Sequence, residues 1–97
     1  DGMAYDADSG DGTVYEYNYS RMNEGGCVMF CLEEAIHNTF RDNVSYDDLG
    51  GTISPSQNPD AHLEHNIFYV RDGVPFVRAR MDGGSFTEKD DTILPLP

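Results

Sequence analysis

Residues 23–41 carry the sequence feature that most restricts the fold, a run of apolar side chains at helical spacing. At about 100° per residue, one stripe of this run is apolar and the opposite side is polar. The stripe comprises Val28, Cys31, Leu32, Ala35, Ile36 and Thr39, whereas Glu33, Glu34, His37 and Arg41 face away. Asn23 provides a capping side chain ahead of the run. The pattern predicts a main helix from Cys27 to about Arg41.

Strand signals lie on both sides of this predicted helix. Val14, Tyr15, Tyr17 and Tyr19 have strand propensity, and the three tyrosines alternate as in a strand with one buried face. The stretch "HNIFYVRDGVPFVRARM" (residues 65–81) predicts an antiparallel hairpin that turns at Asp72-Gly73. Between the main helix and this hairpin, "VSYDDLGG" (residues 44–51) indicates a short helix capped by Ser45.

The order of these elements predicts an α+β fold. It would comprise a strand, the main helix, the short helix and then an antiparallel β-hairpin or meander packed on the main helix. Residues 1–12 are acidic and rich in glycine, and we expect a flexible acidic N-terminal segment there. Residues 13–97 are then a single α+β domain. No internal repeat is evident.

The chain is strongly acidic, with 18 Asp and Glu against 6 Lys and Arg and a formal net charge of −12. Such a surface repels nucleic-acid phosphates and anionic lipids, so nucleic-acid and membrane binding are disfavoured unless the protein mimics DNA. No apolar run approaches the ~18 residues that span a bilayer. We expect a basic protein or peptide as partner. The same balance is typical of halophilic proteins, in which it reflects solvation.

Cys27 and Cys31 are the two cysteines of the chain. Four residues apart on a helix, their Cβ atoms would lie ~5–6 Å apart, whereas a disulfide needs about 3.5–4.5 Å. Both are therefore expected to be thiols. Free thiols are typical of a reducing compartment, which favours a cytoplasmic location.

Cys27 is the candidate nucleophile. It would lie in the first turn of the main helix and away from the centre of the apolar stripe, where the helix dipole lowers the pKa of a thiol. The residues around it, "CVMFCLEEAIHNTF…VSYDDLGG", resemble the nucleophile helix of papain-like cysteine peptidases, among them bacteriocin-leader peptidases and Josephin-type deubiquitinases. In that family a histidine at the start of a strand and an Asp or Asn at the end of the next strand follow.

The resemblance implies a small cysteine hydrolase that acts on amide bonds without a cofactor. It implies Cys27 as nucleophile, His65 as general base and Asp82 as the residue that orients the histidine. The family usually has a glutamine shortly before the cysteine to stabilise the oxyanion, and Asn23 is the amide nearest to that position here.

Two other interpretations stay open. Cys27, Cys31, His62 and His65 form a C-x3-C and H-x2-H set that could bind zinc in a Cys2His2 site. Alternatively, the chain is an acidic interaction protein, such as an inhibitor or immunity factor, with Cys31 in the core and Cys27 as an incidental surface thiol. Arg71, Arg78 and Arg80 would then form a positive patch or pair with nearby acids.

Overall fold

The computed structural model describes residues 2–31, 36–49, 53–56, 60–77 and 86–97. In these ranges all regular secondary structure is β-strand. The strands are β1 (Met3–Asp8), β2 (Val14–Glu16), β3 (Tyr19–Arg21), β4 (Gly26–Cys31), β5 (Asn38–Arg41), β6 (Val44–Tyr46), β7 (Ile53–Ser56), β8 (Ala61–Glu64), β9 (Ile67–Val70), β10 (Thr87–Lys89) and β11 (Thr92–Pro95). None of the described residues forms a helix that could cross a membrane.

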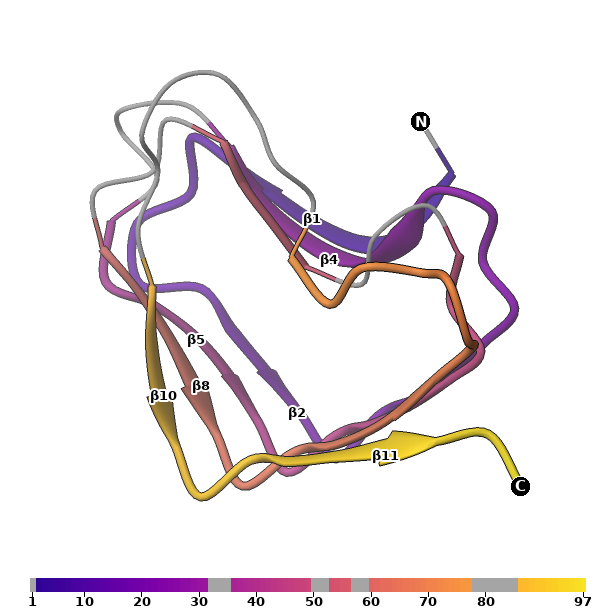
Figure 1. Cartoon of the computed structure of the whole chain (residues 1–97). Helices are drawn as coiled ribbons and strands as arrows, with labels where there is room; N and C mark the ends of the chain where they lie inside the picture. The colour runs from indigo at the N-terminus through magenta and orange to yellow at the C-terminus, as the bar shows by residue number, and fades with distance from the viewer. Residues whose placement is uncertain (1, 32–35, 50–52, 57–59, 78–85) are drawn as a thin grey trace.

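The strands form three parallel sheets, in the orders β1-β4-β7, β10-β8-β5-β2 and β11-β9-β6-β3. Each turn of the chain adds one strand to each sheet in the same order, and the last described turn adds β10 and β11. The chain therefore winds as a parallel β-helix, with the sheets as its walls (Figure 1). Each such coil packs only on its neighbours, as in other solenoid proteins.

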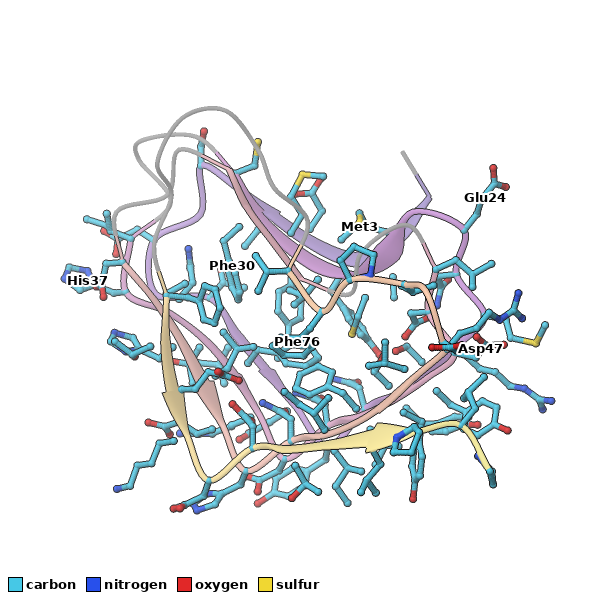
Figure 2. All side chains as sticks on the ribbon, in the orientation of Figure 1. Met3, Glu24, Phe30, His37, Asp47 and Phe76 are labelled. Atoms are coloured by element: carbon cyan, nitrogen blue, oxygen red, sulfur yellow. The ribbon has the colours of Figure 1, made fainter. Side chains whose placement is uncertain are left out.

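The interior of the coil holds the apolar core. In the second sheet, Tyr15 pairs in register with Phe40 and Phe40 with Leu63, so these inward side chains stack along the axis. Phe40 and Phe68 stack across two sheets with their ring centroids 6.2 Å apart. Figure 2 shows Phe30 and Phe76 pointing into the same interior, whereas Glu24 and His37 point outward.

A ladder of polar side chains fixes one corner of every coil. Asn18, Asn43, Asn66 and Asp91 follow residues with positive φ, namely Tyr17, Asp42, His65 and Asp90 (φ 55–58°). The backbone N–H of each ladder residue donates to the side-chain oxygen of the next, 2.9 Å away at steps of 25, 23 and 25 residues. The Nδ2 groups of Asn43 and Asn66 donate to the carbonyls of Tyr15 and Phe40. The bonds from the backbone N–H groups satisfy donors that the tight corners leave out of the sheets.

The predicted α+β fold and its main helix were wrong. Cys27 and Cys31 lie in strand β4, and Asn38–Arg41 form β5, while residues 32–35 lie outside the described residues. Because β4 lies between β1 and β7, it is paired on both edges and nearly all of its side chains are buried. A strand covered in this way has a continuous apolar run, which cannot be distinguished from a buried helix by periodicity.

The other predicted elements were only partly correct. The strand around residues 14–19 exists as β2 and β3, but Tyr17 and Tyr19 are 79% and 60% exposed because a sharp corner separates them from the inward-facing Tyr15. Val44–Tyr46 form strand β6 where a short helix was expected. Ile67–Val70 form β9, which pairs in parallel with β6 and β11 and not in a hairpin. Residues 3–8, expected within a flexible segment, form β1.

Candidate functional site

The predicted catalytic residues are not brought together. Cys27 is fully buried, and its Sγ lies 3.5 Å from the Ser20 hydroxyl. His65 lies at an exposed corner between β8 and β9, with its Nε2 3.2 Å from Asp90 Oδ2. Asn23 bonds to Asp48, and Asp82 lies outside the described residues. Burial raises the pKa of the Cys27 thiol to about 12, which is the opposite of what a nucleophilic cysteine needs.

The zinc set is also dispersed. Cys27 and Cys31 lie four residues apart on a strand, roughly 13 Å along its axis, and they form no disulfide. His62 lies on the outside of β8, where it pairs with Asp60 at 2.7 Å and bonds to Thr87. Among the described residues, no group of three or more His, Cys, Asp or Glu side chains is placed to hold a metal ion.

Cys27 instead borders a largely buried polar group, which we call the Asp48 cluster (Ser20, Asn23, Ser45 and Asp48) and to which Asn23 belongs as a half-exposed member. Asp48 is 1% exposed. Its Oδ2 accepts hydrogen bonds from the hydroxyls of Ser20 and Ser45, at 2.6 and 2.5 Å. Its Oδ1 accepts from the backbone N–H and the side-chain amide of Asn23, at 2.9 and 2.8 Å.

The Asp48 cluster joins two neighbouring coils of the helix, and Asn23 is the one member of it that is partly exposed. Ser20 and Ser45 pair in register on adjacent strands, and Asp48 follows strand β6. Tyr5 lies close enough for Cys27 and Asp48 to raise the pKa of its hydroxyl, although burial is the larger cause. The cluster stabilises the fold and offers no access to a substrate.

The buried Cys27 thiol leads to a testable difference in reactivity. With a pKa of about 12, roughly one Cys27 in 10⁴ is a thiolate at pH 8, against about one in four for an unperturbed thiol. We expect iodoacetamide to modify Cys27 in the folded protein at least a hundredfold more slowly than in urea-unfolded protein, as followed by peptide mass spectrometry. Equal rates in the two states would contradict this placement of the thiol.

A second polar group is the ion pair of Asp47 and Arg71, which follow the carboxyl ends of β6 and β9. Its Arg71 side is exposed to solvent. Arg71 Nε and one terminal nitrogen donate to the two carboxylate oxygens of Asp47, at 3.0 and 2.7 Å. The Asp47 side chain is only 7% exposed, whereas that of Arg71 is 48% exposed. These bonds raise the pKa of the Arg71 guanidinium. Of the predicted positive patch of Arg71, Arg78 and Arg80, Arg71 is paired with Asp47, so its charge is neutralised. Arg78 and Arg80 lie outside the described residues.

Arg71 also lines a hollow of about 570 Å³ in the surface. The hollow lies between the turn that follows β9 and the end of β11. Asp47, which holds Arg71 beside this turn, is labelled in Figure 2. Its lining comprises Val70, Arg71, Asp72, Gly73, Val74, Pro95 and Leu96. Sequence reasoning identified the turn at Asp72-Gly73 but not the hollow, because β11 comes beside β9 only through the winding of the coil.

At the last described coil, Asp91 ends the polar ladder. Its Oδ1 accepts from both N–H donors of Asn66, while its Oδ2 is buried and has no hydrogen-bond partner among the described residues. Glu88 lies beside it, and burial is the main cause that raises the pKa of both carboxyl groups. A proton on Glu88 would provide the donor that Asp91 Oδ2 lacks.

No family model matches the chain. The chain is 40% identical over 91 residues to the lacto-N-biosidase of Bifidobacterium longum subsp. longum, an alignment that covers 93% of this chain and 6% of that protein. The crystal structures of GH136 lacto-N-biosidase from Eubacterium ramulus, native and selenomethionine derivative, match with TM-scores of 0.94. In both, sequence identity is 67% over 99% of this chain and 16% of that chain.

These similarities contradict the resemblance to papain-like cysteine peptidases and the function predicted from it. Nothing in them supports an acidic inhibitor or a zinc-stabilised domain either. The chain spans 6% and 16% of the lengths of the two relatives. Over nearly its whole length, it is similar to one segment of a GH136 lacto-N-biosidase.

Proposed function

We propose that this chain is a segment of a lacto-N-biosidase, a glycoside hydrolase, and forms several coils of its β-helix. The observation that carries the proposal is 67% identity with a TM-score of 0.94 to the Eubacterium ramulus enzyme over 99% of this chain. At that level of identity, the shared residues outnumber the buried ones, so outward side chains are shared as well. A shared scaffold alone would not require the outward side chains to be retained.

The geometry limits how this segment takes part in the reaction. Its interior is filled by the apolar core, the polar ladder and the Asp48 cluster, so a saccharide meets only outward-facing side chains. Glycoside hydrolases commonly use two carboxyl groups on either side of the scissile bond. The chain has 18 acidic residues, many of them on its outer surface, and the stacked coils hold outward side chains at fixed spacings.

The test is an assay of the longer polypeptide that carries this chain. We expect it to hydrolyse a 4-nitrophenyl lacto-N-bioside, measured by the release of 4-nitrophenol. The Eubacterium ramulus enzyme, assayed in the same buffer, is the positive control. If that enzyme releases 4-nitrophenol and the folded test protein releases none, the proposal is wrong.

A further inference from the structure

The outer face of the third sheet differs in chemistry from the rest of this acidic chain. Its four strands, β3, β6, β9 and β11, contain no Asp or Glu, although the chain has 18 of them. Ser20, Ser45 and Phe68 are buried, so the residues on either side of each point outward. One outward row in register comprises Arg21, Tyr46, Tyr69 and Leu94, and the next comprises Tyr19, Val44, Ile67 and Thr92. We call these two rows the tyrosine face, which lies on the wall that ends in β11 (Figure 1).

The outer face of the second sheet provides a comparison within the same coil. Its outward row comprises Glu16, Arg41, Glu64 and Lys89, which lie in register and alternate in charge. Arg41 Nε donates to Glu16 at 2.8 Å. Opposite charges on adjacent strands suit a face that is covered by water. The tyrosine face carries a single charge, that of Arg21, and an aromatic and aliphatic surface of this kind indicates a binding site.

Arg21, Tyr46 and Tyr69 form a continuous stack across three coils. The guanidinium carbon of Arg21 lies 5.6 Å from the ring centroid of Tyr46, and the rings of Tyr46 and Tyr69 are 5.6 Å apart and tilted by 50°. These contacts hold the three side chains in place, so that little conformational entropy is lost when a ligand binds. In the part of the chain that the structure describes, no carboxylate pairs with Arg21, and no hydrogen bond holds the hydroxyl of Tyr46 or Tyr69. The stack therefore offers unused N–H and O–H groups beside exposed ring carbon.

The two central tyrosines are outward-facing whatever coils adjoin this segment. Strand β6 lies between β3 and β9, and β9 lies between β6 and β11. Further coils would add strands beside β3 or β11, along the axis of the helix. They would not cover the outward side of Tyr46 and Tyr69.

We propose that the tyrosine face binds a neutral saccharide, with Arg21, Tyr46 and Tyr69 as its contact residues. The C–H groups of a sugar ring pack on the tyrosine rings, and its oxygens accept hydrogen bonds from the guanidinium and the phenol hydroxyls. An anionic ligand is repelled by the net charge of −12, and a wholly apolar partner would leave the Arg21 charge desolvated and unpaired. The inference rests on the proposed function, because it names the face on which this segment contacts a glycan. It gives these residues no part in bond cleavage.

The test compares Arg21→Ala and Tyr69→Ala with Arg41→Ala in the longer polypeptide. Arg41 is a matched control, since it is an outward arginine on the second sheet. Titration calorimetry measures the affinity for free lacto-N-biose, a disaccharide without the bond that the proposed reaction cleaves, and thermal unfolding checks the fold of each variant. We expect about tenfold weaker binding for Arg21→Ala, the effect of losing one hydrogen bond from a charged group. Tyr69→Ala should weaken binding by a similar factor through lost apolar contact, and Arg41→Ala should not change it.

A second readout uses the wild-type protein and does not depend on the folding of a variant. Lacto-N-biose should slow the nitration of Tyr69 by tetranitromethane, as followed by peptide mass spectrometry. Tyr17, which is 79% exposed at the corner before β3, is the internal control and should be nitrated at the same rate with and without the saccharide. Equal protection of both tyrosines, or of neither, contradicts the inference.

Three other results would overturn the inference. They are no binding of lacto-N-biose to the wild type, equal affinities in all variants, and a loss of thermal stability in Arg21→Ala and Tyr69→Ala without a change in affinity. The last result would mean that another part of the longer polypeptide covers this face. A protein that binds the saccharide through Arg21 but does not hydrolyse the 4-nitrophenyl substrate refutes the proposed function alone. One that hydrolyses it with equal affinity in all variants refutes this inference alone.

Discussion

Replacing Asp48 with alanine is expected to lower the free energy of unfolding by roughly 4 kcal/mol. The carboxylate accepts four hydrogen bonds, two from serine hydroxyls and two from Asn23. Alanine leaves the two buried serine hydroxyls without this acceptor, and each such group costs about 1–3 kcal/mol unless water enters, whereas the donors of the partly exposed Asn23 can bond to water. Urea unfolding followed by far-ultraviolet circular dichroism measures the change.

Two further variants serve as comparisons. Asp48→Asn keeps the shape of the side chain, and Glu24→Ala is an exposed control. Asp48→Asn has nearly the same volume, and its Oδ1 can still accept from Asn23 while the serine hydroxyls rotate to accept from its amide. We expect it to cost about 1–2 kcal/mol. Glu24→Ala, on the exposed turn before β4 (Figure 2), should change stability by less than about 0.5 kcal/mol. A loss for Asp48→Ala no greater than that for Glu24→Ala would contradict the structural role of the cluster.

The sequence predicted the short strand β2 but placed helices where strands β4, β5 and β6 lie. Tyr15 alternates with exposed neighbours, and β2 was expected. Strand β4 was mistaken for a helix because nearly all of its side chains are buried. Partners for β4 come from β1 and β7, on other coils. Periodicity within one segment has no information about such distant partners, so tertiary pairing decided the secondary structure.

A weaker signal of the coil was present but was not recognised. Asn18, Asn43, Asn66 and Asp91 recur at steps of 25, 23 and 25 residues. Each follows a residue with positive φ that L side chains seldom adopt. A short polar residue at such spacing is the mark of a repeated corner, as in other solenoids. The sequence around it varies so much that the repeat is visible only once the corners are aligned.

The candidate site could be predicted only in part. Asp47 and Asp48 were assigned to the start of a short helix, whereas one anchors Arg71 and the other organises a buried cluster. Cys27 attracted attention as a thiol near a predicted helix terminus, and its burial removes that chemistry. The basic partner and the reducing compartment stay predictions.

Replacing Asn66 with alanine is expected to cost roughly 3 kcal/mol of unfolding free energy. Asn66 is 1% exposed and links three coils, since its Oδ1 accepts from the Asn43 backbone and its Nδ2 donates to the Phe40 carbonyl and to Asp91. Alanine leaves the buried Asn43 N–H without its acceptor and removes one hydrogen bond from the Phe40 carbonyl. The effect should therefore exceed that of the lost side-chain contacts alone. Urea unfolding measures it under the same conditions.

The matched control for Asn66 is Glu64→Ala, two residues earlier on the outward side of β8. Its half-exposed side chain should contribute less than about 1 kcal/mol. Hydrogen exchange adds a local readout, because the Asn43 N–H, protected by its bond to Asn66, should exchange faster in Asn66→Ala and at the original rate in Glu64→Ala. Equal stability and equal exchange in the two variants would mean that the ladder is a consequence of the corner geometry and not a cause of it.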